Sequence, residues 1–278
     1  MPRQNILHEQ ILNAAAASFF QQFCDMKIIC MALTVLLMAS CSIKQDRSGC
    51  PSLLRLDFSA EKKAAPDAEL LLSVNCRGKC LLADTVRLGE ISGLYDVEVP
   101  KDLLNVNVWS EDASRFVSGG SLFIPLGDDC PAVDMFSQTV DLSGAETKTL
   151  PVELSKNYCV LDITFKDEGI DDFVVDIEGD IDGYSEKGLP RKGDFFHFLD
   201  SPMKLLLPRQ TEATLKLDIW KGHELLKTFA LGNYMEKGGY DWAAKNLKDA
   251  SVTIDFACTT VNIVVGEWDN TSDFDIVF

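Results

Sequence analysis

Hydrophobic and polar residues alternate along most of the chain beyond residue 50, with the short period of a β-strand. In the runs Leu54–Phe58 and Leu104–Val108 every second residue is apolar. Further runs of this kind are Leu215–Ile219, Val252–Phe256 and Val261–Val265. A period of two places one face of a strand in a core and the other in water. The pattern therefore predicts a protein built from many short, half-buried strands.

Turn-forming residues separate these runs. The turns are Arg77-Gly78, Ser118–Gly120, Gly127–Asp129, Asp182-Gly183 and Lys237–Gly239. Short strands between such turns are typical of β-sandwiches. Beyond residue 41 only Asp241–Leu247 suggests a helix, of roughly two turns.

A polar turn, Ser143–Thr147, precedes the run Leu150–Leu154, which could lead from one sandwich into the next. Dividing the chain near residue 150 leaves roughly seven strand candidates in each half, which suits one sandwich apiece. The expected fold class is therefore all-β, with two tandem β-sandwich domains over residues 50–150 and 151–278.

The region before Cys41 has the pattern of a lipoprotein signal. The run Ile28–Met38 is apolar and uncharged, follows the cation Lys27, and ends in Ala39-Ser40 before Cys41. A secretory signal core needs roughly 7–15 apolar residues, whereas a transmembrane helix needs about 20. We expect residues 26–40 to be removed and Cys41 to be acylated on sulfur as the membrane anchor. The alternative is a buried core helix that ends in cysteine.

Residues 1–25 precede Met26-Lys27, a natural start for a signal peptide. We therefore predict that residues 1–25 are an over-extended translation start. Residues 41–49 are short, polar and without apolar periodicity, and they are expected to be a tether between the lipid and the first domain.

The charge balance restricts the partners. The chain has 26 Lys and Arg against 43 Asp and Glu, a net charge of −17. So acidic a protein repels nucleic acid and anionic headgroups. We expect no nucleic-acid partner, and attachment to the membrane through the lipid alone.

Six cysteines follow Cys41, an even number that permits disulfides in an exported chain. Cys76 and Cys80 flank a plausible hairpin loop, so a bridge between them is conceivable. Cys159 and Cys258 lie in strand-like runs and are alternatively small core residues. The Cys-x3-Cys spacing has no second close pair, so a zinc site is not expected.

Catalytic patterns are scarce. No nucleophile elbow, phosphate-binding loop or His-Glu-x-x-His motif is present. Ser59–Lys62 fits Ser-x-x-Lys but lacks the two companion motifs, and His197 and His223 are the only histidines beyond His8. His197 suits a strand with one polar side chain better than a general base. We expect no catalytic residues, no cofactor and no enzyme activity.

The acidic stretch Asp176–Gly183 is dense in the oxygen ligands that calcium prefers. Aligned to an EF-hand, the stretch puts Leu189 where a bidentate Glu is required, which rejects that motif. A solvated acidic loop is the expected structure, with a looser surface calcium site as the alternative.

Several segments together resemble a known family. Cys41–Pro51, with Asp46-Arg47-Ser48 before Cys50-Pro51, resembles the mature N-terminus of the FimB-type fimbrial anchor lipoproteins of Bacteroidales. Asn157–Phe165 is similar to the opening strand of that family's second domain. The ending is similar too, with Gly239–Trp242 followed by two strands and Val265–Trp268.

The resemblance implies two transthyretin-like β-sandwiches and a lipid-anchored role at the outer membrane, where the chain would anchor or initiate a fimbria. Its partners would be other fimbrial subunits, joined by donor-strand contacts. The terminal run Phe274–Phe278 could be a donor strand or the last strand of its own domain. Cleavage after Arg47 or Arg55 would instead indicate a shaft subunit.

Two alternatives stay open. One is a tip or accessory adhesin of the same superfamily, and the other is a surface glycan-capture lipoprotein. Aromatic residues on exposed loops would favour the adhesin, and the candidates are Trp109, Trp220, Trp242 and Trp268. Glycan capture would need a concave site with paired carboxylates or an aromatic platform. Because each lies in or beside a strand-like run, core packing is the expected role of these side chains.

Overall fold

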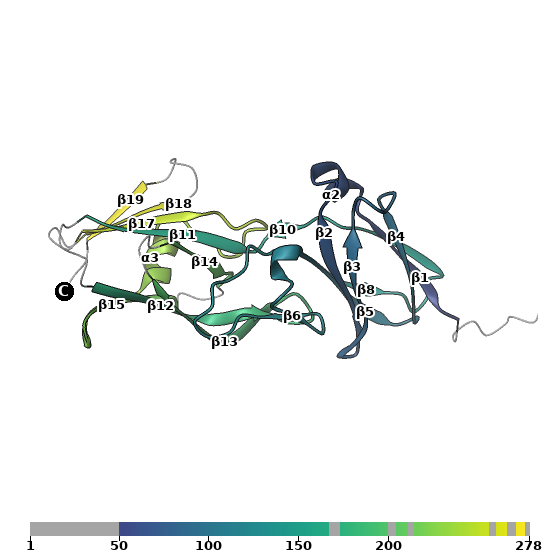
Figure 1. Ribbon diagram of the computed structural model, residues 1–278, viewed down its shortest axis with the longest axis horizontal. Coiled ribbons are helices and arrows are strands. Elements are labelled where there is room, and N and C mark those ends of the chain that lie inside the picture. Colours follow the sequence, from purple (N-terminus) through teal and green to yellow (C-terminus); the bar gives the residue numbers. More distant parts are fainter. Residues whose placement is uncertain are drawn as a thin grey trace, which may run out of the picture. The chain divides into compact units, whose positions relative to one another are not determined.

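The computed structural model describes residues 50–166, 173–199, 204–210, 214–255, 260–265 and 271–275, and within them the fold is an all-β sandwich fold (Figure 1). The predicted upstream extension, the signal at 26–40, Cys41 and the tether lie outside the described residues. In the part described, no helix is long and apolar enough to cross a membrane.

The first sandwich consists of two facing sheets. The smaller has the order β4 (Leu94–Val99), β1 (Ser52–Asp57), β9 (Thr147–Pro151). The larger has the order β10 (Ser155–Lys156), β8 (Asp134–Asp141), β5 (Leu103–Ser110), β2 (Glu69–Cys76), β3 (Lys79–Arg87). A short helix, α2 (Ser59–Ala64), follows β1.

The alternation predicted from the sequence forms the core of this sandwich. In β1 the side chains are alternately buried and half-buried, and Leu54 and Leu56 are fully buried. They pack with the inward residues of β2 and β5, such as Leu72 and Val106, in one cluster. The other face of the larger sheet is mixed, because it carries the polar residues Ser73 and Asn107 and also Trp109, which packs in the second core cluster.

The predicted turn at Arg77-Gly78 is confirmed as the connection of β2 to β3. Both residues have positive φ, 49° and 75°, as a two-residue type I′ hairpin requires. Because the turn fixes the register of the hairpin, it also determines which residues lie opposite the two cysteines that flank the turn.

The second sandwich again has two facing sheets. One has the order β14 (Lys204–Pro208), β11 (Tyr158–Phe165), β17 (Ala250–Asp255), β18 (Thr260–Val265), β19 (Thr271–Asp275). The other has the order β16 (Glu224–Phe229), β15 (Lys216–Lys221), β12 (Phe173–Tyr184), β7 (Ser121–Phe123), β6 (Val117–Ser118), and β13 (Pro190–Leu199) also pairs with β12.

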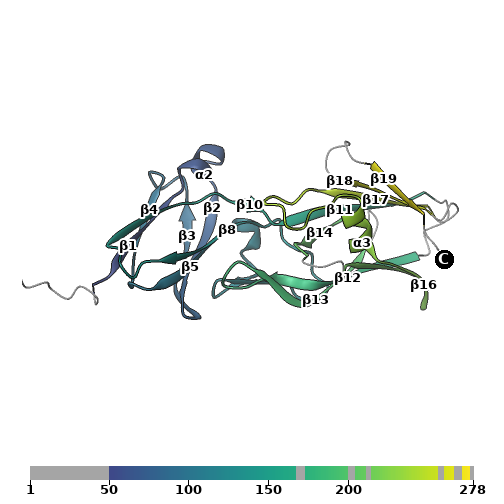
Figure 2. The ribbon, with the colours of Figure 1, turned by 180° about the vertical axis from the view of Figure 1, so that it is seen from behind.

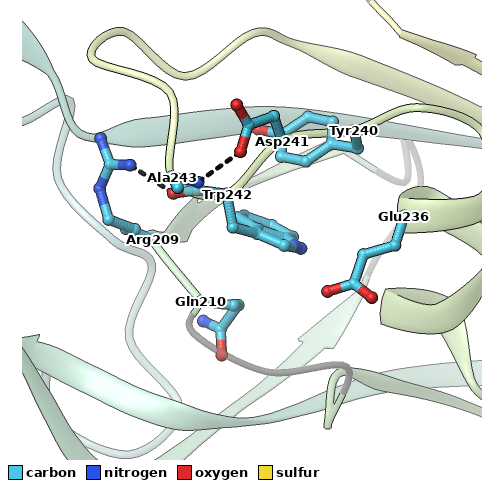
Figure 3. A pocket seen from close by; sticks show the side chains of 7 residues that line it. All are labelled: Arg209, Gln210, Glu236, Tyr240, Asp241, Trp242 and Ala243. Atoms are coloured by element: carbon cyan, nitrogen blue, oxygen red, sulfur yellow. Dashed lines mark hydrogen bonds between the residues drawn. The ribbon is translucent and has the colours of Figure 1, made fainter.

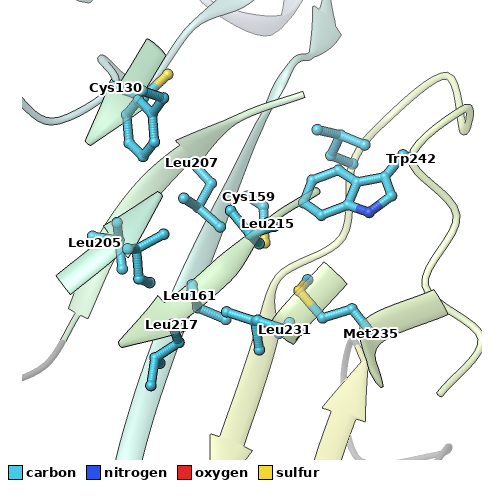
Figure 4. Close-up of a cluster of buried hydrophobic side chains, with 14 of the residues drawn as sticks. Cys130, Cys159, Leu161, Leu205, Leu207, Leu215, Leu217, Leu231, Met235 and Trp242 are labelled. Atoms are coloured by element: carbon cyan, nitrogen blue, oxygen red, sulfur yellow. The ribbon is translucent and has the colours of Figure 1, made fainter. Parts of the chain in front are cut away.

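Its core is a cluster of aliphatic and aromatic side chains from both sheets and from α3 (Leu231–Lys237) (Figure 4). Both ribbon views show α3 between the β17–β18 layer and the β12–β15 layer (Figures 1 and 2). Cys130 and Cys159 belong to this cluster as buried free thiols. Burial raises the pKa of Cys159 to about 12, which makes it an inert packing residue.

The two sandwiches repeat one arrangement of seven strands. In the first, β1 pairs antiparallel with β4 and parallel with β9. In the second, β11 pairs antiparallel with β14 and parallel with β17. The facing sheets repeat as β8-β5-β2-β3 and β16-β15-β12-β13. In the second sandwich, β18 and β19 are additional.

One segment of the first half of the chain lies in the second sandwich. After η1 (Glu111–Ala113), β6 and β7 pair with each other, and β7 pairs with β12. Conversely, β10 pairs with β8 of the first sandwich. The boundary near residue 150 stays a proposal. Short strands on either side of this boundary pair with strands of the other sandwich.

Two sequence predictions are wrong. Asp176–Gly183 is not a loop, because it lies inside the twelve-residue strand β12. Residues 241–247 are not a helix, since the two helices described, α2 and α3, lie elsewhere. The predicted runs at β1, β5, β15, β17 and β18 are confirmed as strands.

Candidate functional site

A pocket of about 570 Å³ lies in the second sandwich, beside the segment that leads from α3 to β17 (Figure 3). Three stretches of chain far apart in sequence line it. They are Arg209 and Gln210 after β14, Glu236 in α3, and Tyr240–Ala243. This volume is within the range of small-molecule sites, about 300–1,000 Å³.

Arg209 fixes the wall of the pocket. Its Nη1 donates to the carbonyls of Trp242 and Ala244, the latter at 2.9 Å, and its Nε donates to Asn157 Oδ1 at 3.1 Å. These hydrogen bonds occupy carbonyl groups that would otherwise accept the backbone hydrogen bonds of an α-helix. The sequence prediction of a helix failed here because the partner, Arg209, lies more than thirty residues away.

Tyr184 of β12 supports the same wall of the pocket. Its hydroxyl donates to the Asn157 carbonyl at 2.5 Å and accepts from the Arg209 backbone N–H at 3.0 Å. The side chain is fully buried, and burial raises the pKa of this phenol. The neutral hydroxyl is therefore a permanent structural link between β11, β12 and Arg209.

Buried polar atoms with unused hydrogen-bonding capacity lie at the pocket. Trp242 is 6% exposed and Gln210 is 1% exposed, yet Trp242 Nε1 and Gln210 Oε1 have no partner. Gln210 Nε2 donates to the Pro208 carbonyl. In Figure 3 the indole nitrogen of Trp242 is on the side of the ring that faces Glu236. Both atoms are enclosed by the protein rather than open to the pocket, and Gln210 Oε1 faces Gly179 of β12.

The charge that lines the pocket is negative. Glu236 and Asp241 are exposed, and among the described residues neither forms an ion pair. Asp241 Oδ1 accepts from the Ala243 backbone N–H at 2.8 Å. The guanidinium of Arg209 is already committed to carbonyls on the other side of the loop.

A second candidate site is the outer edge of β9. The Leu53 N–H donates to the Glu146 carbonyl and the Val152 N–H donates to the Asp57 carbonyl. In a parallel pair with this register, alternate residues of β9 bond to β1 and the others point away. The backbone groups of Thr147 and Thr149 therefore point outward, and no strand of the described chain pairs with them.

The equivalent edge in the second sandwich is covered. There β17, the counterpart of β9, pairs antiparallel with β18, as Ser251↔Val264 and Thr253↔Asn262. Phe274 and Asp275, the described residues of the predicted terminal run, end β19, which pairs with β18. Of the two alternatives predicted for this run, the described residues form a strand of their own domain, and 276–278 lie outside them.

The predicted lipidation site, Cys41, lies outside the described residues and stays a prediction. Cys76 and Cys80 are free thiols in this structure. Cys80 pairs across the hairpin with Asn75, and Cys76 with Lys79. Cys76 is buried and Cys80 is exposed, so the bridge is not formed here.

The structure also places the other residues that were singled out in the sequence. His197 lies in β13, as predicted, and its ring contacts the Gly127 carbonyl and Asp129. Trp109 and Trp242 are buried, and Trp220 donates to Asp176 Oδ2 at 2.8 Å. Within the described residues no three His, Cys, Asp or Glu side chains are grouped to hold a metal ion. Ser59–Lys62 begins helix α2.

The pocket itself was not predicted. Its residues come from three separate segments, and only Gly239–Trp242 drew attention, as part of the family resemblance. The one local signal was the pair of acids Glu236 and Asp241, each two residues from the Gly238-Gly239 turn.

No family model and no curated protein sequence matches the chain. Its fold is similar to that of a candidate polysaccharide-binding protein from Bacteroides thetaiotaomicron, with a TM-score of 0.58 and 12% identity over 81% of this chain and 98% of that one. It is also similar to the fimbrial anchor protein Mfa2 from Porphyromonas gingivalis, with a TM-score of 0.55 and 11% identity over 79% and 98%.

A third similar structure is a candidate adhesin from Bacteroides ovatus, with a TM-score of 0.52 and 14% identity over 80% of this chain and 96% of that one. At these identities the likeness shows the fold. The chain is thus an all-β protein of the paired-sandwich fold found in these bacterial proteins, and each of the three is covered almost from end to end.

Proposed function

We propose that this protein is a non-enzymatic fimbrial subunit that anchors or initiates a fimbria at the cell surface. The observation that carries the proposal is the open edge of β9. The repeated second sandwich has two further strands at the equivalent edge, so the first sandwich has room for a strand from another subunit. The shared fold with a fimbrial anchor protein supports the same role.

The contact would be β-augmentation, in which a partner strand pairs with the outward backbone groups of Thr147 and Thr149. The edge is short, and it carries Lys148 and Pro151. A cation and a proline protect an edge strand from unselective pairing. Only a partner strand that matches this short register would then bind.

A lipid on Cys41 would hold the assembled subunits at the outer membrane. Intact-mass measurement of membrane-extracted protein tests this step, with the acylated chain beginning at Cys41 as the expected result. Replacement Cys41→Ala should release the protein or its fimbriae from the cells. Normal surface retention of the variant would contradict the lipid anchor.

Thr149→Pro tests the edge itself. Proline removes the outward N–H of Thr149 but leaves the bonds between β9 and β1, which use Lys148 and Leu150. Loss of one backbone hydrogen bond, about 1–1.5 kcal/mol, corresponds to roughly tenfold weaker subunit binding. The control Thr149→Val keeps the N–H and should bind normally. Unchanged binding and fimbriation of folded Thr149→Pro would contradict donation at this edge.

A further inference from the structure

We infer that the second sandwich binds a second copy of this chain on the outer face of its sheet β15-β12-β13. We call this surface the open face, and its side chains include those of Val174, Glu178, Phe198, Asp218 and Trp220. The edge of β9 lies in the other sandwich, so this contact goes beyond strand addition there. Either contact can therefore fail without the other.

The equivalent face of the first sandwich shows how such a surface is covered. On both faces a tryptophan lies opposite an aliphatic residue of the neighbouring strand, as Trp109↔Leu71 and Trp220↔Val174. Trp109 is fully buried against the core of the second sandwich, whereas Trp220 is half-buried and Val174 is exposed. The chain thus contains one covered and one uncovered version of the same face.

A hairpin turn forms part of the covered contact. Residues 185–189 join β12 to β13 and lie on the outer face of the first sandwich, where the Glu186 carbonyl accepts from Asn107 Nδ2 at 2.7 Å. The equivalent turn of the first sandwich is Arg77-Gly78, between β2 and β3. A Cβ at Gly78 would meet nothing within 4 Å, so this turn has open space around it. A second copy can therefore present the equivalent turn to the equivalent face.

The charges of the two surfaces are complementary. Arg77 and Lys79 are exposed on either side of the glycine of the turn. The open face carries the exposed Glu178 and the half-buried Asp218 beside one cation, Lys216. Two copies with a net charge of −17 each repel one another in most orientations. The basic turn against the acidic face is an orientation in which they attract, and such pairing sets the register of a contact.

Apolar side chains lie beside these acids. Phe196 and Phe198 pack edge to face with ring centroids 4.7 Å apart, and Phe198 and Val174 are exposed. Aromatic side chains are enriched where proteins bind one another. Because the turn and the open face are different surfaces, the contact is heterologous, and its repetition extends the assembly beyond a dimer.

Sedimentation velocity of the purified full-length protein over a series of concentrations tests the inference. We expect the average mass to rise with concentration past that of a dimer, and to fall when added salt screens the charges. Thr149→Pro, which alters the edge of β9, should associate as the wild type does. Its result separates this contact from strand addition.

Two charge reversals identify the surfaces. Arg77→Glu and Glu178→Arg each bring like charges together and should weaken association at least about tenfold. A mixture of the two variants has opposite charges at each contact between unlike copies, so the mixture should associate again. Lys63→Glu is the matched control, because Lys63 is exposed in α2 and undergoes the same reversal of charge.

Three results would overturn the inference. They are a monomer at all concentrations, association of the turn variants equal to that of the wild type, and a mixture that stays monomeric. Arg77 also pairs with Asp102 at 2.7 Å, so its replacement could disturb the hairpin. Lys79→Glu then takes its place in each experiment, because Lys79 has no ion pair among the residues that the structure describes.

Discussion

The two sandwiches share seven strands in one arrangement and differ in what covers them. In the first, the outer face of the larger sheet is buried and carries both polar and apolar side chains, with Ser73 3%, Asn107 0% and Trp109 0% exposed. In the second, the equivalent face is partly open and carries Val174 and Phe198, 43% and 56% exposed. The smaller sheet shows the reverse, since β9 has a free edge and β17 is covered by β18.

The difference shows that one strand arrangement can be used for different contacts in the two sandwiches. This buried outer face of the first sandwich contacts the second sandwich. Asn107 Nδ2 donates to the Glu186 carbonyl at 2.7 Å, and Ser137 Oγ donates to the Lys187 carbonyl at 3.0 Å. The first sandwich buries its broad face in an internal contact, and its β9 edge is unpaired among the described strands. The other closes its edge and keeps a pocket.

The largest effect expected is from Leu122→Ala. Leu122 of β7 is fully buried in the core of the second sandwich, although it lies in the first half of the chain. A Leu→Ala change in a core lowers the free energy of unfolding by about 2–5 kcal/mol. Hydrogen exchange measured by mass spectrometry should show faster exchange in β12 and β15.

Leu56→Ala is the matched change in the other core, since Leu56 is equally buried in β1. It should raise exchange first in β2 and β5. If Leu122→Ala raised exchange only in residues 50–110, the assignment of β7 to the second core would be wrong.

The next effect concerns the hairpin of β6 and β7. Gly120 has φ +85°, and a Cβ there would lie 2.1 Å from Asn75 Nδ2, whereas a Cβ at Gly119, with φ +58°, meets nothing within 4 Å. Gly119→Ala should therefore show only the strain of a left-handed residue, about 1–2 kcal/mol. Gly120→Ala adds a steric clash on a buried polar face and should cost more. Thermal unfolding of the pair measures the difference, and equal melting temperatures would show that the hairpin does not press on β2.

A smaller effect is expected from Tyr184→Phe. The change removes the hydroxyl that joins the Asn157 carbonyl to the Arg209 N–H and leaves both groups buried without it. Unsatisfied buried groups cost about 1–3 kcal/mol. Chemical denaturation should detect this loss. Ser137→Ala removes a hydroxyl from the contact with the other sandwich and serves as the comparison. A stability of Tyr184→Phe equal to wild type would mean that water replaces the hydroxyl.

The local sequence pattern predicted the strands that have one buried and one exposed face. It failed where a residue distant in the sequence determines the backbone conformation. The alternation in β1 and β15 was sufficient, because Leu54 and Leu217 each meet a core. In β12 the same alternation was present, with Ile177 buried between Asp176 and Glu178, but the density of acids suggested a loop. At residues 241–247, Arg209 determines the backbone from another strand, which no local pattern shows.

The smallest effect concerns β12 and the open face of the second sandwich. Burial raises the pKa of Asp176. The hydrogen bond from Trp220 lowers this pKa, and the charge of Asp218, its paired residue in β15, raises it. A raised native pKa means that the folded state binds the proton more readily, so stability is lost as pH rises through that value. Asp176→Asn keeps an oxygen for Trp220 but removes the charge. It should be slightly more stable than wild type at pH 7, by no more than about 1 kcal/mol. The advantage should shrink as the pH falls toward the ordinary value of 3.8. Asp162→Asn, which removes a carboxylate at an exposed position of β11, is the control. An advantage of Asp176→Asn that stayed constant from pH 7 to pH 4 would show that the ionisation of Asp176 is not the cause.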